Sequence, residues 1–232
     1  MALILAMTGV AVALPQPSTR PSPPLTVKET MELVHITSYR MTLVPLDELC
    51  YADDPAARAY IDACSEMARA ARRLAVAARE RFGKNAPADL PPLDLNLAKT
   101  AREGTDELQQ MDDPYMKILP ACKVEEKGDA AVVRLPGGTI AAHARKTNGV
   151  WKINFPEVSG GVEHTGTIPN VPEPQSTLKA YRGLAKIDLD LERELLAGKF
   201  KTTDEFAAER QRRQHQLMQE IAPEPAAPAS QP

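Results

Sequence analysis

Aromatic side chains are scarce in this sequence. They make up 4% of the 232 residues and include a single tryptophan, whereas alanine is common. The core must therefore be built from small side chains, mostly on helices. The 43% of apolar residues and 25% of charged residues are typical of a soluble globular protein.

Cysteine and excess positive charge are also lacking. The three cysteines, Cys50, Cys64 and Cys122, are too few for a disulfide scaffold, and their spacing matches no zinc ligand set. A net charge of −3 lacks the positive field that a general nucleic-acid binder needs. The sequence therefore predicts no metal site, no cofactor and no nucleic-acid partner.

No apolar run near the N-terminus is long enough for a membrane-spanning helix. The uncharged run over residues 2–14 falls short of the roughly 18–20 residues required, but it suits the apolar region of a signal peptide. Ala11-Val12-Ala13 supplies the small residues of a cleavage site. No lysine or arginine precedes the run, which leaves open a start further upstream or a buried N-terminal helix. We predict a signal peptide over residues 1–13, export to the periplasm or the extracellular space, and contact with the membrane only during export.

Proline-rich stretches divide the rest of the chain. We predict a proline-rich linker over residues 14–25, a folded domain over 26–156 and a glycine- and proline-rich loop over 157–173. A pair of helices over residues 174–221 and a disordered tail over 222–232 complete the division.

Capping residues and apolar spacing locate the helices. Thr26 and Glu29 form a capping box at the start of a helix that extends to about residue 39. A short helix over 46–51 precedes a long amphipathic helix over 56–82, which Asp54 caps and Gly83 ends. One or two short helices are expected within 95–111. The last two helices cover about 176–197 and 202–221. The second of them starts with another capping box, formed by Thr202 and Glu205. Its basic cluster, Arg210, Arg212 and Arg213, is interpreted as a solvated face.

Between residues 121 and 156 the pattern changes to alternation. Turns at 128–129, 136–139 and 148–149 delimit four antiparallel strands. The register places Val124 opposite Val133, Ala142 opposite Val133, and Ala144 opposite Ile153. It also places Leu135 opposite Ile140 and predicts one apolar face. The opposite, solvated face is predicted to carry Arg134, His143, Arg145, Lys152 and Asn154.

These elements resemble a known superfamily. The run LDELCYADDPAARAYIDACSEMARAARRLAVAARERFG, followed by GDAAVVRLPGG and NGVWKI, is similar to exported bacterial proteins of the nuclear-transport-factor-2-like superfamily. The resemblance covers residues 26–156. It implies an α+β fold in which N-terminal helices pack on a curved antiparallel sheet to form a cone with a pocket, and a C-terminal helical hairpin follows. It implies no particular chemistry, because the fold does not determine the function.

The predicted pocket offers apolar surface without a catalytic group. Catalysis of the ketosteroid isomerase type would need an acid or base on the apolar face of the sheet, where apolar walls can raise the pKa of a carboxyl group. The predicted inward face carries none, so we assign no catalytic residue. We expect the pocket to be lined by Tyr39, His35, Trp151, Ile153, Phe155 and Val133.

The function predicted from these residues is that of an exported non-catalytic module. It would bind a small apolar ligand or a protein partner through the cone. Two alternatives stay open: an isomerase or hydratase of the cone fold, and an assembly protein that uses its C-terminal helices, for which a homodimer is one form. In an oxidising compartment, Cys50 and Cys64 are candidates for a disulfide, with Cys122 left as a buried thiol.

Overall fold

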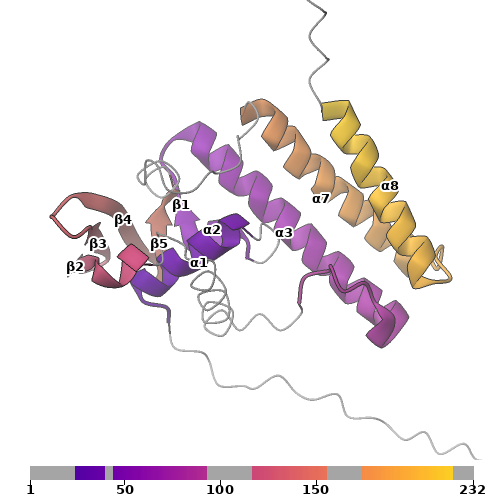
Figure 1. Cartoon of the computed structure of the whole chain (residues 1–232), viewed down its shortest axis with the longest axis horizontal. Coiled ribbons are helices and arrows are strands. Elements are labelled where there is room, and N and C mark those ends of the chain that lie inside the picture. The colour runs from indigo at the N-terminus through magenta and orange to yellow at the C-terminus, as the bar shows by residue number, and fades with distance from the viewer. Residues whose placement is uncertain (1–23, 40–43, 93–116, 156–173, 222–232) are drawn as a thin grey trace, which may run out of the picture.

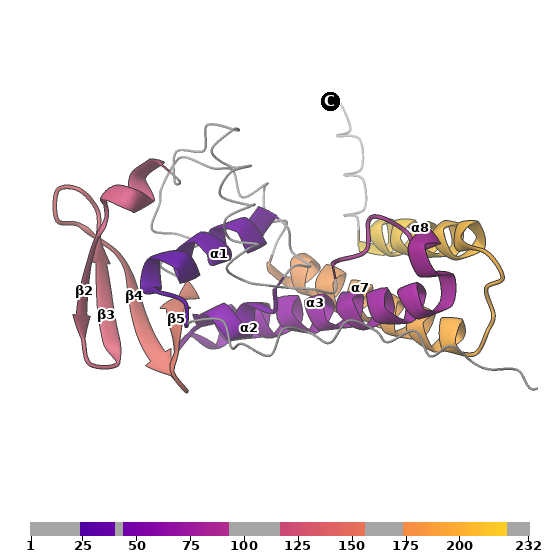
Figure 2. The same cartoon turned by 90° about the horizontal axis from the view of Figure 1, so that it is seen from below.

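A computed structural model describes residues 24–39, 44–92, 117–155 and 174–221. A sheet with two short helices lies at one end, and three long helices form a layer at the other (Figures 1 and 2). The longest helix passes from the sheet into the helical layer. The predicted signal peptide, nearly all of the proline-rich linker, the 157–173 loop, the short helices within 95–111 and the C-terminal tail lie outside the described residues.

The first helix begins where its capping box places it. In front of helix α1 (Val27–Tyr39), the backbone N–H of Glu29 donates to Thr26 Oγ1 at 3.2 Å, and the N–H of Thr26 donates to Glu29 Oε2 at 2.8 Å. Helix α2 (Leu46–Leu49) ends earlier than predicted. The next two residues form strand β1 (Cys50–Tyr51), which the sequence analysis wrongly included in the helix. A two-residue strand is too short to show alternation, so only its pairing partner reveals it.

Helix α3 (Pro55–Phe82) confirms the predicted amphipathic helix. Asp54 Oδ2 accepts from the N–H of Ala57 at 2.7 Å, and Pro55 occupies the first turn, where its missing N–H costs nothing. Gly83 ends the helix with a φ of 60°, a conformation that glycine adopts without strain. The buried face of α3 is rich in alanine, so neighbouring helices can approach it closely.

The sheet is mixed, with five strands in the order β1-β5-β4-β3-β2. Strands β2 (Lys123–Lys127), β3 (Ala130–Arg134), β4 (Ile140–Thr147) and β5 (Val150–Asn154) form the predicted antiparallel meander, and β1 adds to β5 in parallel. Asn148 and Gly149 both have positive φ, as a type I′ turn requires, which confirms the turn predicted at 148–149.

The predicted strand register is confirmed except beyond one irregularity between β3 and β4. Val124 pairs with Val133, Val133 with Ala142, and Ala144 with Ile153. A β-bulge between Val133 and Arg134 then places Ile140 opposite Arg134, so the predicted pairing of Leu135 with Ile140 is wrong. Because a bulge turns a side chain to the other face, Ile140 is 45% exposed rather than buried.

Two apolar cores lie along α3. The first, the sheet core, joins the N-terminal half of α3 to α1, α2 and one face of the sheet. The second, the helix core, joins the C-terminal half of α3 to the last two helices. Strands β3, β4 and β5 contribute to the sheet core Ala131, Val133, Ala142, Ala144, Trp151 and Ile153, and β1 contributes Cys50. The helix core contains Leu74, Ala75, Ala77, Ala78, Leu90, Leu191, Leu195, Phe200 and Phe206.

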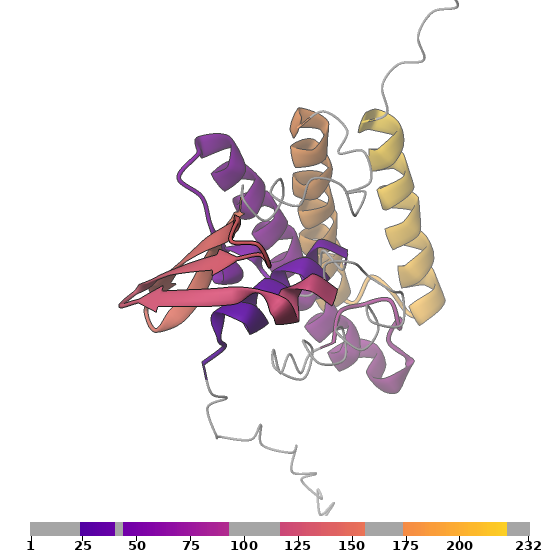
Figure 3. The same cartoon turned by 60° about the vertical axis from the view of Figure 1, so that its left-hand side comes forward.

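The C-terminal helices are α7 (Pro174–Leu196) and α8 (Thr203–Ile221), close to their predicted bounds. Thr202 Oγ1 accepts from the N–H of Glu205 at 3.2 Å, as the second capping box predicts. Helix α7 lies between α3 and α8 (Figure 3). Its Tyr181 and Ala185 belong to the sheet core and its Leu191 and Leu195 to the helix core, so α7 packs along most of α3.

Candidate functional site

Three of the six predicted pocket residues are parts of the sheet core. Val133, Trp151 and Ile153 are 0%, 4% and 0% exposed, and Leu33, Val34 and Ile36 of α1 are buried in the same core. The structure therefore brings these three residues together, with side chains of α1 packed among the same cluster.

The other predicted pocket residues are more scattered. His35 is half-buried on α1, and the side chain of Tyr39 lies outside the described residues. Phe155, just past β5, stacks on Tyr60 of α3 with ring centroids 5.2 Å apart. On the other face of the sheet, His143 lies where it was predicted, but it is half-buried rather than solvated.

An aromatic cluster that the sequence analysis missed joins α3, α7 and the end of β5. The hydroxyl groups of Tyr60 and Tyr181 are 3.4 Å apart, and their rings meet edge to face. Burial raises the pKa of both phenols, and the nearby Cys64 contributes to each shift. Both groups stay protonated at neutral pH, which makes them poor general bases. No local pattern could reveal this pair, because it joins residues far apart in the chain.

All three cysteines are buried free thiols. Burial raises the pKa of Cys50 and of Cys64 to about 12, so neither forms a thiolate at neutral pH. Both residues belong to the sheet core, Cys50 on β1 and Cys64 on α3. The disulfide between them stays a prediction for an oxidising compartment.

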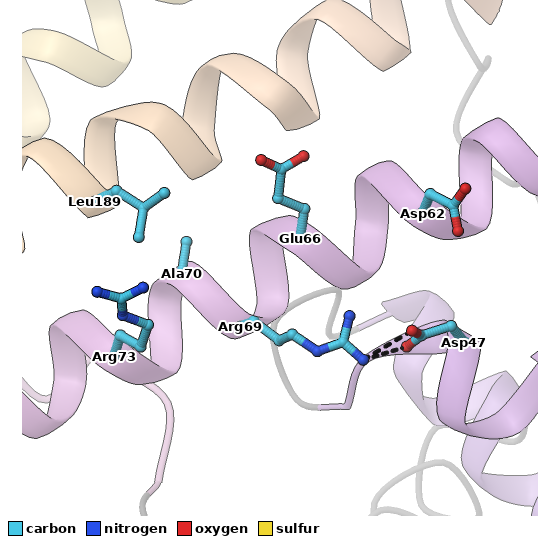
Figure 4. A pocket seen from close by; sticks show the side chains of 7 residues that line it. All are labelled: Asp47, Asp62, Glu66, Arg69, Ala70, Arg73 and Leu189. Carbon is cyan, nitrogen blue, oxygen red and sulfur yellow. Dashed lines mark hydrogen bonds and ion pairs between the residues drawn. The ribbon is translucent and has the colours of Figure 1, made fainter.

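A hollow of about 270 Å³, the charged hollow, lies between α2, α3 and α7 (Figure 4). On one side, Arg69 Nη2 lies 2.8 Å from both carboxylate oxygens of Asp47. On the other, Arg73 Nη2 lies 3.0 Å from Glu192 Oε2. The complete lining consists of Asp47, Asp62, Glu66, Arg69, Ala70, Arg73 and Leu189.

A second and larger hollow of about 820 Å³, the helical groove, lies along α8 and reaches Leu184 of α7. Met218 contributes apolar surface to it and is 46% exposed. The remaining lining comes from Ala208, Gln211, Arg212, Gln214 and His215. Neither hollow is lined by any of the six predicted pocket residues.

Ion pairs hold α8 against α7. Arg210 is 12% exposed and lies between Asp188 at 3.4 Å and Asp89. Arg213 joins Glu194 of α7 and Glu209 of its own helix, each at 2.8 Å. The interpretation of this basic cluster as a solvated face is therefore wrong for Arg210 and Arg213, which lie against partners from other parts of the chain.

The pKa values of the carboxylates follow from these contacts. Burial raises the pKa of Asp188 above its ordinary value, although Arg210 opposes the shift. A hydrogen bond from Arg212, partly offset by burial and reinforced by Arg213, lowers the pKa of Glu209 to about 2. At neutral pH, Glu209 is therefore a fixed negative charge between two arginines.

The described residues hold no group of three or more side chains placed to bind a metal ion. None of the described helices is both long and apolar enough to cross a membrane. Comparisons with protein-family models, with curated proteins and with solved structures find no match to this chain. The fold is established as α+β, with helices packed on a five-stranded mixed sheet and a C-terminal helix pair.

Proposed function

We propose that this chain is a non-catalytic protein-binding module and that its helical groove receives the partner. The observation that carries the proposal is the open groove beside α8, where Met218 stays 46% exposed next to Leu184. Exposed apolar surface rimmed by polar groups is typical of protein interaction sites. The function is thus assigned to the helical layer rather than to the sheet.

A small apolar ligand in the sheet core is less favoured. Such a ligand would contact Val133, Trp151 and Ile153, which are buried in the same core as side chains of α1. Its entry would require packed apolar side chains to separate, and dense protein interiors resist this. The helical groove requires no such opening because it already faces solvent.

The absence of catalysis is supported by the side chains of the sheet core. The side chains that β3, β4 and β5 contribute to this core are all apolar, and burial raises the pKa of the Cys50 thiol on β1 to about 12, so the sheet offers this core no group that readily transfers a proton at neutral pH. The phenols of Tyr60 and Tyr181 keep their protons at neutral pH because burial raises their pKa values. These observations favour binding over acid–base chemistry at the sheet.

The lining of the helical groove indicates the chemistry of its occupant. Leu184 and Met218 provide apolar contact, whereas Gln211 and Gln214 offer amide donors and acceptors. A short amphipathic helix matches this combination, with apolar side chains directed at Leu184 and polar ones along the glutamines. We therefore assign the groove to a helical segment of a partner protein.

Site-specific photocrosslinking in the native host tests the assignment. A benzophenone amino acid replaces Met218 in one variant and, as the matched control, Gln216 in another, because Gln216 is exposed on α8 but does not line the groove. We expect a distinct protein adduct from position 218 only. The purified partner should then bind the Met218→Glu variant at least about tenfold more weakly than the parent protein. Equal adducts from both positions, or none from position 218, would contradict the proposal.

Two finer assignments are proposed on narrower grounds. The superfamily resemblance over residues 26–156 is supported by the order of elements, in which helices precede a meander with one buried face. Export is supported by the apolar run over residues 2–14 and its A-x-A motif. N-terminal sequencing of the protein from its host should begin close to Leu14, and an intact Met1 would contradict export.

A further inference from the structure

Two rows of opposite charge lie on neighbouring helices, an acidic row on α3 that lines the charged hollow and a basic row on α7. On α3, Asp62 and Glu66 are exposed one turn apart and both line the hollow. On α7, Lys179, Arg182 and Lys186 are exposed at steps of three and four residues. Leu189, which also lines the hollow, continues that spacing, so the basic row lies on the same side of α7.

Neither row is neutralised by the described part of the chain. Asp62 and Glu66 form no ion pair with any residue that the structure describes, and the same holds for the three cations of α7 within the described ranges. Figure 4 shows the contrast on one helix: Arg69 is bonded to Asp47, whereas Asp62 and Glu66 form no hydrogen bond or ion pair with the other residues drawn. These charges are thus concentrated at one end of the α3–α7 surface.

The two helices run in parallel, which fixes how the rows are arranged. Tyr60 meets Tyr181 near one end, and Arg73 meets Glu192 further along. The acidic row of α3 therefore lies at the height of Arg182 and Lys186. Further along, the signs are reversed, with arginine on α3 and glutamate on α7.

We infer that a second copy of this chain docks on this surface through a two-fold axis that runs between α3 and α7, parallel to both. Such an axis places α3 of one copy over α7 of the other at the same height. Glu66 then faces Lys186 of the second copy, and the reciprocal pair forms by symmetry. A partner carrying one sign of charge would be repelled by one of the two rows, whereas the second copy complements both.

The charged hollow gives this interface its central contact. The half-buried Leu189 supplies apolar surface beside the charged side chains, and Glu66 projects near it (Figure 4). A long basic side chain of the second copy can lay its methylene groups on Leu189 while its charge meets Asp62 and Glu66. The interface thus combines apolar burial with charge complementarity.

Sedimentation equilibrium of the full chain tests the inference. We expect a dimer at low salt whose dissociation constant rises at least about tenfold when the salt is raised from about 0.05 M to about 0.5 M. Glu66→Lys should weaken the dimer at least about tenfold. The control Glu126→Lys makes the same charge change on exposed strand β2, away from this surface, and should leave the dimer intact.

The charge-swapped variant gives the decisive result. Glu66→Lys combined with Lys186→Glu should restore the dimer, because the pair is re-formed across the axis with its signs exchanged. Circular dichroism of each variant confirms that it is folded. A monomeric parent protein at low salt would overturn the inference, as would a dimer that Glu66→Lys leaves unchanged. A folded swapped variant that stays monomeric would also overturn it.

Discussion

A β-carbon added to Gly183 of α7 would lie 2.5 Å from Cδ1 of Leu217 on α8. A β-carbon essentially never lies so close to an atom of another side chain, so an alanine at position 183 would require the Leu217 side chain to shift. Leu217 fills the space that a larger residue would occupy. Together with the ion pairs of Arg210 and Arg213, this contact positions α8 and thus one wall of the helical groove.

Gly183→Ala should change the stability of the parent protein and that of the Leu217→Ala variant in opposite directions. Alanine favours a helix over glycine by about 1 kcal/mol, whereas the clash with Leu217 is an overpacking penalty of about 1–3 kcal/mol. We expect a net loss of stability in the parent protein and a gain once Leu217→Ala removes the clash. Urea unfolding of the four proteins in this double-mutant cycle measures the difference. Equal effects in both backgrounds would show that the helices do not meet at this pair.

Arg210→Ala should destabilise the protein far more than Arg212→Ala. The first change leaves the Asp188 carboxylate, whose side chain is 5% exposed, without its cation, and breaking such a buried pair costs about 3–5 kcal/mol. The second removes an exposed arginine from the same helix, and exposed pairs contribute little. Chemical denaturation at pH 7 gives the comparison. Similar losses in the two variants would indicate that Arg210 is solvated.

Part of the stability that Arg210→Ala loses should be recovered at acidic pH. Burial already raises the pKa of Asp188, and removal of Arg210 should raise it further. The penalty for the buried carboxylate therefore grows as the pH rises through the folded pKa and disappears once Asp188 is protonated. The stability difference between the parent and Arg210→Ala should accordingly shrink as the pH falls from 7 toward about 4. A difference independent of pH would contradict the burial of Asp188.

The contribution of Glu209 to stability should be lost in acid. Its folded pKa is lowered to about 2, so the carboxylate stabilises the folded state above its ordinary pKa of 4.5 and loses that effect as the pH falls toward 2. The urea midpoint of the parent protein should exceed that of Glu209→Gln at neutral pH. The two midpoints should converge below pH 4.5. A constant gap between them would mean that the arginine contacts are not formed in solution.

Val133→Ala and Ile140→Ala should distinguish the bulged register of β3 and β4 from the register without a bulge. Val133 is fully buried, and removal of its methyl groups should cost roughly 2 kcal/mol. Ile140 is 45% exposed because of the bulge, and we expect a loss below about 1 kcal/mol. Guanidinium unfolding monitored by the fluorescence of Trp151 provides the readout. Equal losses of stability in the two variants would indicate that β3 and β4 pair without a bulge.

The sequence by itself determined the elements whose signals are local. The capping box at Thr26 and Glu29, the cap at Asp54 and the Asn148-Gly149 turn all function as their residue types predict, because each depends on neighbours within four positions. The alternation in β3, β4 and β5 likewise predicted the buried face with Val133 and Ile153. Their side chains had to lie on one side of the sheet in order to leave water.

The tertiary structure decided everything that depends on residues distant in the chain. Strand β1 exists because Cys50 reaches Ile153, the bulge turns Ile140 outward, and Arg210 is buried because α8 folds back onto Asp188. The two hollows are likewise bounded by side chains from different helices, and none of the predicted pocket residues lines them. Such contacts leave no periodic trace in the sequence, because the free energy that forms them comes from packing between elements rather than from the preferences of either element alone.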